Sequence, residues 1–116
     1  MSEADKKPIY WVGTSRKDLS GFPDEVRDEI GFAIYQAELG ERHASAKTMK
    51  VLDAVEIVSD YDGDTFRGVY TTKYKGVLFV LHCFMKKSKN GIKTPKAELD
   101  LIKKRLKDAK KIYDSI

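Results

Sequence analysis

The 116-residue sequence has one cysteine, three prolines, two histidines and no long hydrophobic run. The single cysteine, Cys83, cannot form an internal disulfide, and its apolar neighbours indicate a buried, inert thiol. The longest apolar run, residues 77–84, is far shorter than the roughly 20 residues of a membrane-spanning helix. No apolar segment of the signal-peptide type follows residues 1–7. These absences predict a cytoplasmic protein that has no contact with a membrane.

Most sequence signatures of catalysis are also missing. There is no glycine-rich phosphate loop, no nucleophile elbow and no Cys/His cluster with zinc spacing. Two histidines, His43 and His82, are too few for a histidine-rich site. Asp60, Asp62 and Asp64 alternate around a turn, but the other ligands of a calcium loop do not follow, so we interpret them as turn residues. The sequence predicts no metal and no cofactor.

Basic residues are concentrated near the C-terminus. The formal net charge is +4, yet residues 86–111 contain eleven Lys or Arg against three Asp or Glu, an excess of +8 that leaves −4 for the rest. Such segregation predicts a face that attracts a polyanion. A solvated helix face that is merely rich in lysine would give the same pattern.

Hydrophobic spacing and turn residues predict one compact domain over residues 1–116. We expect a short edge strand at 8–12, a helical turn at 15–21 and a helix over 23–40. Residues 41–53 show no clear period, so they are predicted to be a connector.

Three strands and a helix follow. Residues 54–60 and 64–71 are β-prone and are joined through Asp62-Gly63, a strong hairpin signal, and the apolar run 77–84 suits a central strand buried on both faces. The last helix is expected to begin at Thr94-Pro95, with threonine as its N-cap. Its apolar stripe consists of Leu99, Ile102, Leu106, Ala109 and Tyr113, with the lysines and Arg105 on the opposite face. The order β-α-α-β-β-β-α predicts an α+β fold, with two N-terminal helices and a C-terminal helix on a small antiparallel sheet.

One arginine is placed where it needs a partner. Arg67 projects from the middle of the strand predicted at 64–71, and a covered arginine without a partner is costly. Either it pairs with an acid such as Glu56 on the neighbouring strand, or it lines an open groove.

The next strand carries three chemically active side chains on one face. His82, Phe84 and Lys86 follow the two-residue period of a strand and lead into the loop that begins near Lys87. RNA cleavage through the ribose 2′-hydroxyl needs a base, cations on the phosphate and an acid for the leaving oxygen, but no metal. Arg67 suits the phosphate, because its fork binds two oxygens and keeps its charge.

The other side chains complete this set. Lys86 or Lys87 adds a second cation or acts as a base, and His82 acts as acid or base. Phe84 or Tyr74 stacks a nucleobase. In the alternative interpretation, His82 and Phe84 are core residues and the basic positions are ordinary surface residues. Composition and spacing alone therefore indicate a nucleic-acid-binding α+β domain.

From Phe32 to Lys110 the chain resembles the RelE/ParE superfamily, specifically its phage-derived, Gp49-like, HigB-type branch. The resemblance is carried by Ala46-Lys47-x-x-Lys50, Tyr61-Asp62-Gly63-Asp64-Thr65-Phe66-Arg67-x-Val69-Tyr70 and Val80-Leu81-His82-x-Phe84-x-Lys86-Lys87-Ser88-Lys89-x-Gly91-Ile92-x-Thr94-Pro95. Three such segments in this order make the match specific.

The resemblance implies the toxin of a type II toxin–antitoxin system, a metal-independent endoribonuclease that cleaves messenger RNA on the ribosome and inhibits translation. It also implies a helix-turn-helix antitoxin and a toxin–antitoxin hetero-oligomer. The expected catalytic residues are Arg67, His82, Lys86 and Lys87. The residues expected to bind RNA or the ribosome are Lys47, Lys50, Tyr74, Phe84, Lys89, Lys93, Lys96, Lys103, Lys104 and Lys107.

Cys83 and Met85 stand where the family pattern has Ala and Gln, changes that we expect to alter packing rather than chemistry. Two other functions keep the same fold. A ParE-like protein would poison DNA gyrase and cleave no RNA, and a phage-derived binding module would have no lethal activity.

Overall fold

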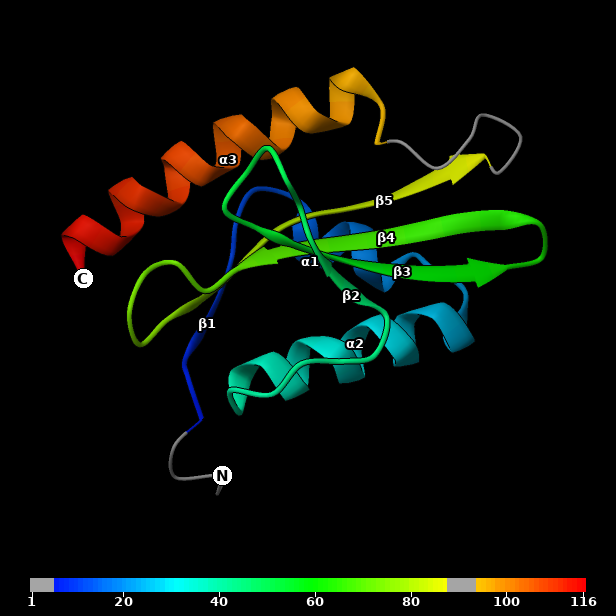
Figure 1. The fold of residues 1–116 in the computed structure, drawn as a ribbon, viewed down its shortest axis with the longest axis horizontal. Coiled ribbons are helices and arrows are strands. Elements are labelled where there is room, and N and C mark those ends of the chain that lie inside the picture. Colours follow the sequence, from blue (N-terminus) through cyan, green and yellow to red (C-terminus); the bar gives the residue numbers. More distant parts are fainter. Residues whose placement is uncertain (1–5, 88–93) are drawn as a thin grey trace.

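The computed structural model describes residues 6–87 and 94–116, which form a five-stranded sheet in the order β1-β5-β4-β3-β2 with helices on both faces (Figure 1). The elements along the chain are β1 (Ile9–Trp11), α1 (Ser15–Ser20), α2 (Asp24–Glu38), β2 (Ala46–Thr48), β3 (Val55–Tyr61), β4 (Asp64–Thr71), β5 (Leu78–Lys87) and α3 (Lys96–Ser115). The predicted α+β fold is confirmed, and the order of the elements is the predicted one with one strand, β2, added. None of the helices in these two ranges is long and apolar enough to span a membrane.

The β3–β4 hairpin forms at the Asp-Gly signal. Asp62 and Gly63 have φ values of 50° and 82°, a left-handed pair that two-residue hairpin turns require. The two strands pair antiparallel from Tyr61 and Asp64 at the turn to Val55 and Tyr70.

Two features differ from the sequence prediction. The connector at 41–53 contains β2, a three-residue edge strand that pairs antiparallel with β3 and is too short to show a period. At the other edge, β1 pairs with β5 in parallel, whereas all other neighbouring strands are antiparallel. The predicted central strand β5 lies one place from the edge of the sheet, between β1 and β4, and its continuous apolar run is explained by helices that cover it from both sides.

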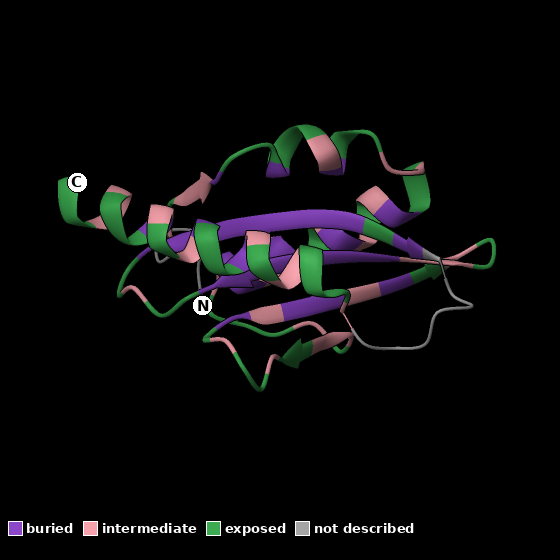
Figure 2. Ribbon diagram, turned by 90° about the horizontal axis from the view of Figure 1, so that it is seen from above, coloured by how far each residue is buried: buried purple, intermediate pink, exposed green. Residues whose placement is uncertain are grey.

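Each face of the sheet has its own hydrophobic core. The helices α1 and α2 cover one face and α3 covers the other, as Figure 1 shows. The first core includes Ile30, Ile34, Ile57, Leu78 and Val80, and the second includes Val69, Phe79, Leu81, Ile102 and Ala109. Figure 2 shows the central strands buried over most of their length and the outer face of α3 exposed.

A bulge in β5 changes which residues face α3. Val69 pairs with His82 and Tyr70 pairs with Val80, so Leu81 is an extra residue on β5. Leu81 and His82 therefore both contact α3, although they are consecutive. After the bulge, the alternating positions that continue on this face are 84 and 86. The bulge thus brings a histidine, an aromatic ring and a lysine beneath the first turns of α3.

Candidate nucleic-acid interface

Arg67 forms a buried ion pair on the sheet face that α3 covers. Its Nη1 donates to Glu56 Oε1 at 3.0 Å, and the two side chains are only 6% and 10% exposed. Thr94, just before α3, donates from Oγ1 to Glu56 Oε2 at 2.9 Å and accepts from Arg67 Nη1 at 3.2 Å. Of the two alternatives for Arg67, the pair with Glu56 is the one that forms. A guanidinium, a carboxylate and a hydroxyl therefore meet where β3, β4 and the start of α3 converge.

Lys86 brings a second cation to this cluster from β5. It pairs with Thr65 across the ladder, and the residue is only 5% exposed. Burial lowers the pKa of Lys86 below its usual value, and the nearby Arg67 lowers it further, whereas Glu56 acts in the opposite direction. A lysine in these surroundings holds its proton less firmly than one in water. Among the described residues, the cluster thus brings the cations of Arg67 and Lys86 close to the Glu56 carboxylate.

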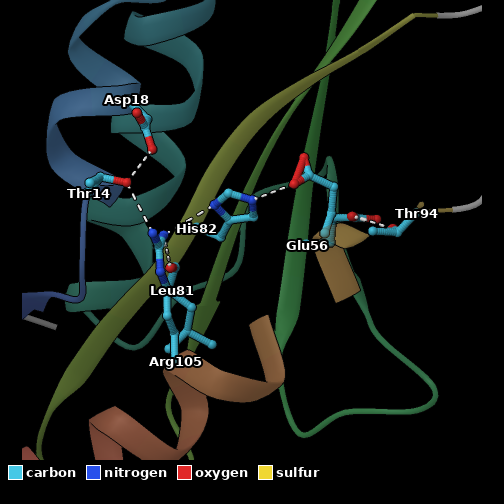
Figure 3. A network of polar contacts seen from close by, with 8 residues as sticks. Thr14, Asp18, Glu56, Leu81, His82, Thr94 and Arg105 are labelled. Atoms are coloured by element: carbon cyan, nitrogen blue, oxygen red, sulfur yellow. Dashed lines mark hydrogen bonds and ion pairs between the residues drawn. The ribbon is translucent and has the colours of Figure 1, made fainter. Parts of the chain in front are cut away.

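His82 is held at both ring nitrogens. Arg105 Nη1 lies 3.2 Å from Nδ1 (Figure 3). Glu98 Oε1 lies 3.1 Å from Nε2. Because an arginine can only donate, Nδ1 accepts and the ring proton sits on Nε2, from which it is donated to Glu98. The imidazole also stacks on Phe84, with ring centroids 4.8 Å apart.

Arg105 connects α3 with β5 and with the start of α1. It donates to the Leu81 carbonyl at 2.9 Å and to Thr14 Oγ1 at 3.1 Å, and Thr14 in turn donates to Asp18 (Figure 3). Gly13, with φ at 59°, allows this approach, because a Cβ there would lie 2.7 Å from Arg105 Nε. The expected placement of Arg105 on the lysine face of α3 is wrong, since the residue is only 8% exposed.

Arg105 is buried because of its position in the period of the helix. Position 105 falls three residues after Ile102 and four before Ala109, so it belongs to the buried stripe of α3. The helix begins at Lys96, and Thr94 is not its N-cap, because Thr94 bonds to Glu56 instead. The sequence analysis did not expect three residues that the structure places at the site: Thr94, Glu98 and Arg105. For Glu98 and Arg105, the one available signal was their spacing of four and three residues from Ile102 in the buried stripe of α3.

The outer face of α3 carries two kinds of lysine. Lys96, Lys104 and Lys110 form i, i+4 ion pairs with aspartates at 3.0, 3.1 and 2.8 Å. Lys103, Lys107 and Lys111 recur every four residues along one stripe, are exposed, and form no ion pair within the described ranges. Ion pairing on the helix thus leaves one lysine stripe for an external anion.

A groove opens beside the Arg67 cluster, between the β2–β3 connection and the first turns of α3. Its volume is about 510 Å³, and both Lys47 and Lys50 are exposed on its rim. Glu56 and Thr94 line the same groove, so it is continuous with the ion pair on Arg67.

Not all of the expected residues come together. Tyr74 packs on Phe79 and Tyr113 near the far end of α3, about 22 Å along the helix from Glu98 at 1.5 Å per residue. Phe84 is buried against His82. The backbone of Lys87 pairs with Asp64, and its side chain lies outside the described part of the chain, as do Lys89 and Lys93.

Cys83, from the sequence analysis, faces away from this cluster. Burial, together with Asp18, raises the pKa of its thiol to about 12, against a smaller opposite effect of Arg105. The expected inert thiol is consistent with this environment.

Comparisons with known proteins agree with the fold. A profile of the family "Phage derived protein Gp49-like (DUF891)" matches residues 17–107. Among solved structures, a free double mutant of the Escherichia coli toxin RelE is similar, with a TM-score of 0.53 and 17% identity over 74% of this chain and 87% of that one. The toxin–antitoxin complex RelBE2 of Mycobacterium tuberculosis has a TM-score of 0.48 and 13% identity over 67% of this chain and 95% of that one. A search of curated protein sequences finds no significant match.

Proposed function

This chain belongs to the phage-derived Gp49-like family, and we propose that it is the toxin of a type II toxin–antitoxin system that cleaves messenger RNA. The observation that carries the proposal is the cluster in which the buried Arg67 and Lys86 lie beside Glu56 under the start of α3. Buried charged groups that meet at one place, one of them with a shifted pKa, are common at functional sites. The RelE-like fold supports the same function.

In the proposed reaction, the ribose 2′-oxygen attacks the adjacent phosphorus while the bond from phosphorus to the 5′-oxygen breaks. Arg67 binds the phosphate oxygens with its fork, and this stabilises the negative charge that develops on them. Lys86 takes the proton of the 2′-hydroxyl, because its lowered pKa leaves a larger fraction of neutral amine than an exposed lysine has. Lys87 is the candidate donor of the proton to the leaving 5′-oxygen. The products are a 2′,3′-cyclic phosphate and a 5′-hydroxyl.

His82 has a positioning role in this proposal. Both of its ring nitrogens are already bonded, to Arg105 and to Glu98, so it holds the start of α3 over the site. Arg67 is only 5% exposed, and we therefore expect the Thr94 side chain, which bonds to it from just before α3, to move aside when a phosphate binds.

The proposal is tested with RNA ends rather than with growth alone. The protein is induced without an antitoxin, and cellular messages are mapped for new ends that carry a 5′-hydroxyl. The purified protein is then incubated with messenger RNA and ribosomes, and the chemistry of both new ends is determined. We expect rapid growth arrest and new ends that carry a 2′,3′-cyclic phosphate and a 5′-hydroxyl. Arrest with DNA breaks and intact RNA would instead indicate a gyrase poison, and normal growth would indicate a binding module.

The lysine stripe of α3 is expected to dock on ribosomal RNA. Changing Lys103, Lys107 and Lys111 to alanine removes up to three phosphate contacts, so the slope of log affinity against log salt should fall by about 2–3 units. Sedimentation of the protein with ribosomes over a series of KCl concentrations measures this slope. Lys17→Ala, on α1 across the sheet, is the control and should leave the slope unchanged. An unchanged slope in the triple variant would mean that α3 is not the docking surface.

A further inference from the structure

The groove beside Arg67 combines an apolar lining with a basic rim. Met49 and Val51 of the β2–β3 connection and Leu99 of α3 supply the apolar side chains, and Val51 is 76% exposed. In Figure 1 this connection reaches toward α3, in agreement with the packing of Met49 against the core beneath that helix. Together these three side chains form an apolar patch in a recess, and an apolar patch rimmed by polar residues is typical of a contact surface.

The charges around the groove favour a nucleic acid. Lys47 and Lys50 are exposed at the rim, whereas the inner end is formed by Glu56 and Thr94, the two residues bonded to Arg67. A ligand in the groove therefore meets the ammonium groups of Lys47 and Lys50 at the rim, apolar side chains below them, and the Glu56 carboxylate with the Thr94 hydroxyl at the inner end. A nucleotide fits this pattern, because its phosphates are anionic, its base has two apolar faces, and amino groups on a base edge can donate to a carboxylate.

The size of the groove favours one base rather than a peptide. Its volume of about 510 Å³ lies within the range of small-molecule sites. A helix or strand of a partner protein needs a longer groove with several successive pockets.

We propose that this groove binds one unstacked base of a single-stranded RNA, next to the phosphate held by Arg67. The base packs between Val51 and Leu99, and Lys47 and Lys50 contact the phosphates that flank it. This inference rests on the proposed function, because it takes the RNA strand to be the ligand of the Arg67 cluster.

The test compares an intact RNA with an abasic one. The probe is a fluorescent hexanucleotide, 2′-O-methylated so that it is not cleaved, with or without one base removed at each position in turn. The variants are Val51→Ser alone, which is too exposed to unfold the protein, and Val51→Ser with Leu99→Ser. Phe32→Ser is the matched control, since Phe32 is 54% exposed on α2 at the opposite face. Fluorescence anisotropy measures each dissociation constant.

We expect the double variant to bind the intact RNA about tenfold more weakly, the size of one lost base contact, and Phe32→Ser to bind normally. Removal of one particular base should weaken binding to the wild type by a similar factor and have no further effect on the double variant. If the double variant bound the intact RNA and every abasic RNA more weakly than the wild type by the same factor, the inference would be overturned and the proposed function would still stand. Unchanged RNA binding together with weaker antitoxin binding would assign the groove to a protein partner. A wild type that neither binds nor cleaves RNA would instead remove the proposed function itself.

Discussion

Replacing Arg67 with alanine is expected to abolish RNA cleavage and to lower the free energy of unfolding by about 3–5 kcal/mol. The loss of stability arises because Glu56 stays buried without its cationic partner. The loss of cleavage arises because the arginine fork no longer binds the phosphate. Urea unfolding measures the first effect, and cleavage of messenger RNA in the presence of ribosomes measures the second.

A second substitution separates these two effects. In the double variant Arg67→Ala with Glu56→Gln, no carboxylate is left without a cation, and the amide still accepts a hydrogen bond from Thr94. We expect this variant to recover most of the lost stability while cleavage stays at background. Recovery of both properties would show that Arg67 is only a structural residue and that the phosphate site lies elsewhere.

Replacing Lys86 with methionine is expected to abolish cleavage without lowering the melting temperature. Methionine occupies a similar volume and has no charge to desolvate at this buried position, which is only 5% exposed. We thus expect function to need this lysine and stability not to need it, a common property of active-site residues. Thermal unfolding and the cleavage assay are measured on the same preparation, and a large fall in melting temperature would mean that Lys86 has a structural role.

The free energies of unfolding of the wild type and of Lys86→Met should depend differently on pH, and this difference tests the direction of the Lys86 pKa shift. Folding lowers the pKa of Lys86, so the folded state binds its proton less firmly than the unfolded state does. The resulting stability cost is fully present below the folded pKa and disappears as the pH rises through the unfolded value of about 10.4. The stability advantage of Lys86→Met over the wild type should thus be largest near neutral pH and shrink toward pH 10. Urea unfolding at pH 7 and pH 10 measures this difference, and an advantage that grows with pH would contradict the lowered pKa.

Wild-type cleavage should rise with pH as Lys86 loses its proton, and it should level off below the usual pKa of lysine, 10.5. Lys86→Arg keeps the positive charge but does not titrate in this range, so its remaining activity should lack this rise. A rise of the same shape in both proteins would assign the base to another group.

The order of the elements other than β2 was readable from the sequence, because each of them carries its own local signal. Asp62-Gly63 predicts the β3–β4 turn through backbone conformation alone, and the apolar run 77–84 predicts a strand covered on both sides. Arg67 and Lys86 were also predicted at the site, since a two-residue period suffices to place a side chain on a face of a strand. Three sequence segments in the right order indicated the family in the same way.

The contacts between elements could not be predicted in this way. Periodicity describes one element at a time, so it missed β2, which is too short to show a period, and it placed Arg105 on the outer face of α3. The bulge at Leu81 shifts the phase of β5 by one residue, and only the pairing with β4 reveals it.

The partners of the site residues depend on the packing of α3 over the sheet. His82 could be read from the sequence as a titratable ring, but its bonds to Arg105 and Glu98 exist only because α3 crosses β5 at that point. The same crossing brings Thr94 to Glu56 and closes the site over Arg67. The sequence by itself determined the fold and the residue types at the site. Tertiary packing decided which of these residues are held by neighbours and which face the groove, because hydrogen bonds and burial depend on distances between segments far apart in the chain.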